Sequence, residues 1–329
     1  MGVRHAMKNI HVALTLDCER PNSETDPTAS GPPSYAAGID STQGYVKIAE
    51  ARGYPVTLFV HPEAATADPS VFKQFEADGH NLGLHLHPWR FADLKYAAEL
   101  GALSDNDARA VISEATSMWQ SALGYRPKIF RSGAASANDS TFRILSELGF
   151  EGGSSTIPGR VYPDIYAIWA GSDPDPHRAN AVFRQLPGQL EFAEVPISVD
   201  SSRQVHKNGR SFHWELRPDW DVEYDEIAFN IVGQVIARAP DVPVINMVTH
   251  NDHNFADPDD PFTVSFSSII DAIEAACERS HLTPIGSTVQ DIVDLTLALP
   301  HKSVELNKAS GKVIQEAGEF IELDMAGLK

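Results

Sequence analysis

Short apolar runs alternate with helical patterns along most of the chain. The runs are rich in Val, Ile and Leu, as in buried strands, and between them apolar residues recur every three or four positions, as in amphipathic helices. The runs predict strands at residues 10–17, 55–60, 81–87, 128–131, 150–155, 194–199, 244–250 and 282–285. The helical spacing predicts helices at 42–52, 70–78, 105–123, 138–148, 223–239, 264–279 and 287–298.

This alternation is typical of βα units and favours an α/β barrel of parallel strands in one domain, residues 8–300. An open dinucleotide-binding sheet is disfavoured, because Cys-Glu-Arg-Pro-Asn follows Asp17 where such a sheet needs a glycine-rich turn. Two stretches, 159–190 and 200–221, break the rhythm and are expected to be long loops. Residues 301–329 are expected to be a C-terminal appendage.

Charge narrows the range of partners. The chain has 45 acidic and 26 basic residues, a formal net charge of −19, which disfavours nucleic acid and anionic membranes as partners. No apolar run approaches the roughly 20 residues of a membrane helix, and no signal-peptide pattern is seen. We therefore expect a cytoplasmic protein whose substrate presents a neutral or cationic group. The two cysteines, Cys18 and Cys277, are too few for a disulfide framework.

Three predicted strands end in residues that bind metals or transfer protons. Asp17 and Glu19 lie two positions apart at the end of the first strand, so an extended chain points both carboxylates to one side. His85 and His87 do the same with two imidazoles, and His250 ends a third strand. Because the carboxyl ends of parallel barrel strands face one mouth, these side chains should converge.

Two imidazoles with one or two carboxylates match the ligands of a catalytic divalent metal. Zinc is the first choice, with cobalt, nickel or manganese as alternatives. Such a metal lowers the pKa of bound water and polarises a carbonyl, which permits amide or ester hydrolysis. A helix-capping Asp or a structurally hydrogen-bonded His is the plainer interpretation of each residue alone. Their coincidence at three strand ends favours the metal site.

Four segments, in order and rough spacing, resemble a known family. They are Asp17-Cys18-Glu19, the run Gly-His-Asn-Leu-Gly-Leu-His at 79–85, Phe-Arg-Ser-Gly at 130–133, and the late His250. In these segments the chain resembles the polysaccharide deacetylases of the NodB-like group, of the carbohydrate esterase family 4 type. The resemblance spans about residues 8–290. It implies a distorted (β/α)7-8 barrel and metal-dependent removal of an acyl group from a sugar.

The resemblance also implies roles for individual residues. Asp17 would be the general base, while Glu19 and His85 would bind the metal. Arg131 would orient the base, although a structural salt bridge to Asp17 is a plainer role for it. His250 would protonate the departing amine.

Two departures from the family pattern leave roles open. The family has adjacent aspartates, whereas here a residue intervenes and the second acid is Glu19, so the roles of Asp17 and Glu19 could be exchanged. The family's second metal histidine lies four residues after the first, and that position is Trp89. His87 is the nearest replacement.

Aromatic and basic residues are candidates for substrate contact. Trp89 and Trp169 are candidate substrate-binding residues, the latter as a groove wall. The basic residues scattered over 203–217 indicate a solvated segment first, and a contact for an anionic group second.

The sequence thus predicts a metal-dependent hydrolase that deacetylates an N-acylated sugar or polysaccharide. One alternative is a related amidohydrolase of small linear or cyclic amides. Another is an inactive, metal-free, carbohydrate-binding barrel, suggested by Trp89 at the second histidine position. The expected partner is a carbohydrate or small amide, and homo-oligomerisation stays open.

Overall fold

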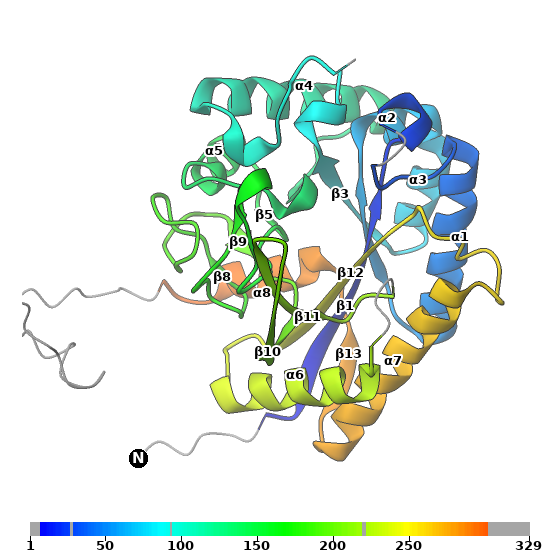
Figure 1. Ribbon diagram of the computed structural model, residues 1–329, viewed down its shortest axis with the longest axis vertical. Helices are drawn as coiled ribbons and strands as arrows, with labels where there is room; N and C mark the ends of the chain where they lie inside the picture. Colours follow the sequence, from blue (N-terminus) through cyan, green and yellow to red (C-terminus); the bar gives the residue numbers. More distant parts are fainter. Residues whose placement is uncertain (1–6, 27–28, 93, 219–221, 302–329) are drawn as a thin grey trace, which may run out of the picture. The chain divides into compact units, whose positions relative to one another are not determined.

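A curled, mostly parallel sheet forms the centre of the protein, and helices cover its outer face (Figure 1). The computed structural model describes residues 7–26, 29–92, 94–218 and 222–301. The sheet contains β1 (Asn9–Cys18), β2 (Val56–Val60), β3 (Asn81–Leu86), β4 (Ile129–Ser132), β5 (Gly152–Gly153), β8 (His177–Arg178), β9 (Ala193–Glu194), β12 (Val244–His250) and β13 (Thr283–Gly286). The helices are α1 (Tyr35–Ala51), α2 (Pro62–Ala67), α3 (Pro69–Ala77), α4 (Asp105–Leu123), α5 (Thr141–Glu147), α6 (Tyr224–Arg238), α7 (Pro261–Arg279) and α8 (Val289–Ala298).

The strand order explains how the sheet curls. The strand order is β12-β1-β2-β3-β4-β5-β9-β8, and β13 also pairs with β1. Among these strands, β8 alone is antiparallel to its neighbour. The open side between β9 and β12 is bridged by the segment after β9. There the Ser198 amide donates to the Asn246 carbonyl at 2.8 Å, and the Asn246 side chain donates to the Val195 and Pro196 carbonyls. The α/β barrel prediction is confirmed, with one antiparallel strand added.

Burial on both faces explains the continuous apolar runs that predicted the strands. In β1, Ile10, Leu14 and Leu16 are buried, and so is Ala13, which points to the other face. Strands covered on both sides lose the alternation of polar and apolar residues. The central strands were therefore predicted within a few residues of their ends.

Capping fixes the ends of the longest predicted helix. The Ser104 hydroxyl accepts from the Asp107 amide at the start of α4, and Gly124 ends the helix in the left-handed conformation. The predicted bounds, 105–123, are those observed. By contrast, α2 was missed because its six residues are too few to show a helical period. Among the described residues, no helix is long and apolar enough to cross a membrane.

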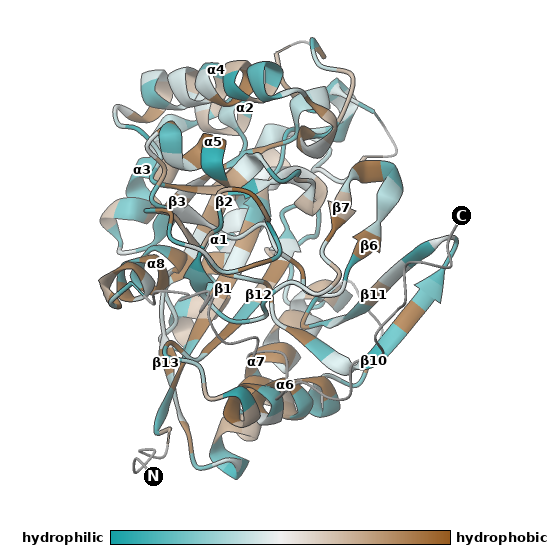
Figure 2. Cartoon of the chain, turned by 90° about the vertical axis from the view of Figure 1, so that its left-hand side faces the viewer, coloured by the Kyte–Doolittle hydropathy of each residue, from teal (hydrophilic) through white to brown (hydrophobic). Residues whose placement is uncertain are grey.

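The two stretches expected to be long loops contain a second, antiparallel sheet. Its order is β10-β11-β6-β7, and Figure 2 shows the β10–β11 hairpin extending beside β6 and β7. The loop prediction was wrong here because β6 and β7 have two residues each and most of β10 is exposed, so no apolar alternation marks them. The bounds are β6 (Val161–Tyr162), β7 (Ala167–Ile168), β10 (Val199–Lys207) and β11 (Arg210–Glu215).

The predicted C-terminal appendage falls almost wholly outside the described residues, which end at His301. Its structure stays a prediction.

Gly44 allows α1 to lie against the loop that follows β12. A Cβ atom at Gly44 would meet the Phe255 carbonyl, and it would lie 2.5 Å from the Ala256 amide nitrogen. We expect Gly44→Ala to lower the free energy of unfolding by about 1–3 kcal/mol, because rigid backbone must shift. Gly233→Ala is the matched control, since Gly233 is exposed on α6 and a Cβ there meets nothing within 4 Å.

The control should stabilise by about 0.5–1 kcal/mol through helix propensity. Urea unfolding followed by circular dichroism measures both variants. Equal effects of the two substitutions would contradict the packing of α1 against this loop.

Candidate active site

The strand register brings the predicted site residues to one edge of the sheet. Asp17 of β1 is the register partner of His250 of β12, and His85 of β3 is the partner of Arg131 of β4. These pairs lie at the carboxyl ends of parallel strands, so the four side chains share one mouth of the barrel. The convergence expected from the sequence is observed.

Glu19, His85 and His87 form a buried cluster of metal-binding atoms. The Glu19 Oε1 atom lies 3.2 Å from the Nε2 atom of each histidine, and the three ligand atoms lie within 4.8 Å of one another. Burial would raise the pKa of Glu19, but His87, His85 and Arg90 hold that pKa well below its usual value. The carboxylate is therefore ionised, as a metal ligand must be.

The other ring nitrogens of both histidines are held by the protein. His85 Nδ1 donates to the Arg131 carbonyl at 3.2 Å, and His87 Nδ1 donates to the Glu99 carboxylate at 2.9 Å. These bonds orient both Nε2 atoms toward Glu19, an arrangement typical of metal-binding histidines. Burial lowers the pKa of His87, but the carboxylates of Glu99 and Glu19 outweigh it and raise that pKa to about 10. The donor atoms and their orientation therefore fit a divalent metal, which would take the place of the proton that this raised pKa keeps on His87.

Asp17 lies beside this cluster and is held by Arg131. Its Oδ1 accepts from Arg131 Nη1 at 2.8 Å, and its Oδ2 lies 4.0 Å from His85 Nε2 and 3.9 Å from His250 Nε2. Burial would raise the pKa of Asp17, but Arg131 and the two histidines lower it below its usual value. Asp17 is thus an ionised carboxylate with one oxygen bound and the other facing two imidazoles.

Arg131 has fixed partners on three sides. Besides Asp17, it donates to the Thr15 hydroxyl and to the carbonyl and hydroxyl of Ser154, each at 2.8 Å. Its guanidinium also lies over the Phe59 ring, 4.0 Å from the centroid. The contact that forms the salt bridge between Arg131 and Asp17 therefore also orients the Asp17 carboxylate.

His250 is partly exposed and lies against a second arginine. Arg217 Nη2 is 3.4 Å from both ring nitrogens of His250. Burial and, after it, the Arg217 charge lower the pKa of His250. Arg217 belongs to the stretch 203–217 that the sequence indicated as solvated first, yet its side chain reaches the site.

The two predicted substrate-binding tryptophans lie in different surroundings. Trp89 is half-buried beside the metal cluster, where its Nε1 donates to Glu99 at 2.7 Å and its ring lies edge-on to His87. Trp169 is fully buried, packs near Phe142 and donates to the Ala135 carbonyl. The structure therefore corrects the groove-wall expectation, because Trp169 is a core residue with no exposed surface.

Several residues that shape the site were not assigned a role in it from the sequence. Glu99, which binds His87, lies in a segment without a clear helical or strand period. Arg90 donates to Glu19 Oε2 at 3.1 Å. Asn251 accepts from the Glu19 amide at 3.0 Å and so fixes the end of β1. Gly133 leaves space for the His87 ring, which a Cβ atom there would meet. The Phe-Arg-Ser-Gly motif was the one signal that pointed to any of them.

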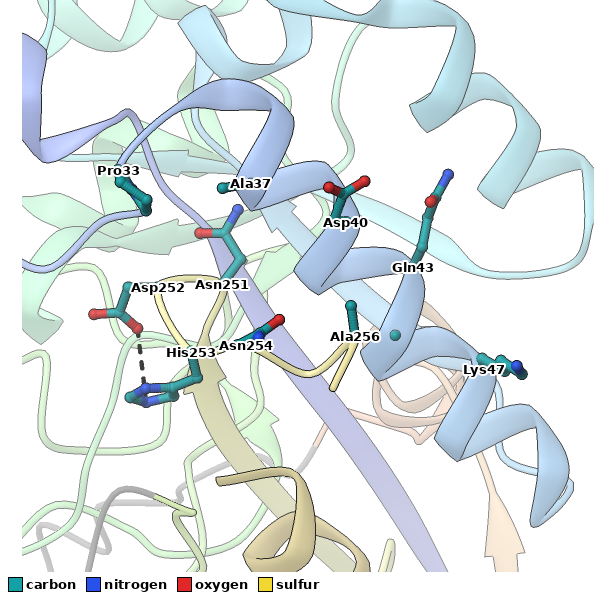
Figure 3. A pocket seen from close by; sticks show the side chains of 11 residues that line it. Pro33, Ala37, Asp40, Gln43, Lys47, Asn251, Asp252, His253, Asn254 and Ala256 are labelled. Carbon is teal, nitrogen blue, oxygen red and sulfur yellow. Dashed lines mark ion pairs between the residues drawn. The ribbon is translucent and has the colours of Figure 1, made fainter. Parts of the chain in front are cut away.

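A polar hollow lies next to the site, between α1 and the loop after β12. Figure 3 shows Asp40 and Gln43 of α1 near this loop, and Asp252 paired with His253. That ion pair measures 3.6 Å. His253, a histidine outside the metal cluster, stacks on the Phe262 ring with 3.9 Å between the ring centroids.

A family model matches the part of the chain that carries three of the site residues. Residues 31–153 match the family model described as polysaccharide deacetylase, a range that includes His85, His87 and Arg131. No curated protein matches the chain.

Solved structures share the fold at low sequence identity. A protein from Mycobacterium smegmatis named as a polysaccharide deacetylase has a TM-score of 0.55 and 16% identity, covering 89% of this chain and 92% of its own. The PuuE allantoinase has the same TM-score and identity, with 87% and 89% covered. A protein from Pseudomonas aeruginosa PAO1, also named as a polysaccharide deacetylase, has a TM-score of 0.54 and 17% identity, with 87% and 90% covered. The match over residues 31–153 and the shared fold confirm the resemblance to the polysaccharide deacetylases seen in the sequence.

Proposed function

We propose that this protein is a metal-dependent deacetylase that removes an acyl group from an N-acylated sugar or polysaccharide. The observation that carries the proposal is the buried Glu19, His85 and His87 cluster, with the ionised carboxylate of Asp17 beside it. The three donor side chains are all present and are held in orientation by the protein. This supports an enzyme over an inactive binding barrel.

A divalent metal would be held by Glu19, His85 and His87, with zinc as first choice. When bound, it lowers the pKa of water and polarises the scissile carbonyl. Glu99 would keep His87 in place through Nδ1, and the Arg131 carbonyl would do the same for His85. Arg90 occupies Glu19 Oε2, which leaves Oε1 facing the histidines.

Asp17 is the residue best placed to take a proton from the attacking water. Arg131 binds Oδ1 and keeps the carboxylate ionised, while Oδ2 stays available next to His85. These contacts support Asp17 as the general base and Glu19 as the ligand, rather than the exchanged roles.

His250 is placed to deliver a proton to the leaving nitrogen. The resting imidazole favours its neutral form, because burial and Arg217 lower its pKa. The Asp17 Oδ2 atom lies 3.9 Å from the Nε2 atom of His250. A proton taken up at Asp17 can therefore reach the leaving nitrogen through His250.

Hydrolysis of small linear or cyclic amides is the second candidate function. A cavity of about 40 Å³ adjoins Asp17 and His250, and Trp169, expected to line a groove, is buried. A site with so little room beside Asp17 and His250 favours a compact acyl group or a small substrate.

His85→Ala should weaken binding of Zn²⁺ at least about 100-fold, because it removes one of three ligands. Calorimetric titration of EDTA-treated protein with Zn²⁺ measures the affinity, and elemental analysis gives the stoichiometry. His206→Ala, on the exposed part of β10, is the control and should bind like the unaltered protein. Unaltered protein that binds no stoichiometric divalent ion would contradict the proposal.

Asp17→Asn should lower kcat by about 10²–10⁴-fold, because the amide cannot take the proton, while Zn²⁺ binding is retained. Release of acetate from N-acetylglucosamine oligomers and from small N-acetyl amides measures the rate. The control is Asp164→Asn, an exposed aspartate paired with Arg210 on the second sheet. Full activity of Asp17→Asn would exclude Asp17 as the base.

Arg217→Gln should raise the pKa of His250, because removing a neighbouring positive charge favours the imidazolium form. NMR titration of the His250 ring in EDTA-treated protein measures this pKa. Arg203→Gln, on the exposed part of β10, should leave it unchanged. A pKa that stays or falls in Arg217→Gln would contradict the assigned contact.

A further inference from the structure

The cavity that adjoins Asp17 and His250 is lined by three arginines. Arg131 holds Asp17, as described above, and Arg160 and Arg217 line the cavity as well. Arg160 lies between β5 and β6, and Arg217 follows β11, so both come from the segments expected to be loops. Among the described lining residues, Asp17 is the one carboxylate, and Arg131 already binds it.

Arg160 is a buried side chain with an unused donor. It is 6% exposed, and its Nη2 donates to Glu215 Oε1 at 2.5 Å. Its Nε is buried, and no hydrogen-bond acceptor for it lies among the described residues. Leaving a buried donor of a charged group without an acceptor is costly, so Glu215 alone does not satisfy the Arg160 guanidinium.

Glu215 holds both arginines from behind. It is fully buried, and its two oxygens contact Arg160 Nη2 and, at 3.4 Å, Arg217 Nη1. One carboxylate thus positions two guanidinium groups toward the cavity that adjoins the reacting groups. A planar guanidinium offers parallel donors that match a carboxylate.

The size of the cavity limits what can bind there. Its volume is about 40 Å³, room for roughly three water molecules. A carboxyl group, with three heavy atoms, fits this space. Ser154 and Ser155 line the same cavity.

We propose that this cavity binds a carboxylate of the substrate, held by Arg160 with Arg217. The inference rests on the proposed function and narrows it: the substrate is a small N-acylated compound that carries a carboxylate close to the scissile amide. It also revises the expectation of a neutral or cationic substrate group, which rested on the net charge of −19. Average charge does not describe a cavity in which, among the described lining residues, arginines outnumber carboxylates.

Binding of malonate and of its neutral analogue malonamide to EDTA-treated protein tests the proposal. Calorimetry should show malonate binding at least about 10-fold more tightly than malonamide. Arg160→Gln should weaken malonate binding at least about 10-fold and leave malonamide binding unchanged. The control Arg238→Gln removes an arginine paired with Asp175, away from the cavity lining, and should change neither.

The double variant Arg160→Gln with Glu215→Gln covers the case in which Arg160→Gln does not fold, because it removes both members of the buried pair. Equal affinities for malonate and malonamide, or unchanged malonate binding in these variants, would overturn the proposal. So would tighter binding of inorganic phosphate than of malonate. Because metal and turnover are absent from this measurement, failure of the proposed function would leave its result intact.

Discussion

A buried guanidinium connects the strands that carry the site. Arg131 extends from β4 to the Thr15 hydroxyl and the Asp17 carboxylate of β1, and to Ser154 after β5. A buried charge is tolerated only when it is paired and its donors are satisfied, and both conditions hold for Arg131. The same contact keeps Asp17 ionised, and the Arg131 carbonyl orients His85. Barrel packing and the placement of the proposed base therefore depend on one side chain.

Electrostatics divides the site into two parts. On one side, Glu19 and Glu99 surround His87, and negative charge favours a cation. On the other side, Arg160 and Arg217 line the cavity next to Asp17 and His250, and positive charge favours an anion. A substrate with a carbonyl at the first part and a carboxylate at the second would satisfy both. The acidic surface of the chain thus does not prevent an anion from binding in the cavity, because the arginines there act locally.

How much of the site could be predicted from the sequence depends on how far apart in the chain the interacting residues lie. Asp17 and His250 were expected at one mouth because strand ends are marked by local apolar runs and parallel topology aligns them. Trp169 was misplaced because a tryptophan in an irregular segment carries no local signal of burial. Glu99 and Arg160 were missed because their partners, His87 and Glu215, lie in other elements and no periodicity links them. The second sheet escaped notice for a similar reason, since its short or exposed strands show no alternation.

The central claim is that Glu19, His85 and His87 bind one divalent metal beside an ionised Asp17. The most direct measurement is anomalous X-ray diffraction at the zinc edge from crystals of the protein grown with Zn²⁺. The account predicts one strong peak in contact with Glu19 Oε1 and with the Nε2 atoms of His85 and His87, and Asp17 still bound to Arg131. A zinc peak elsewhere, or the three side chains turned apart without a peak, would contradict it.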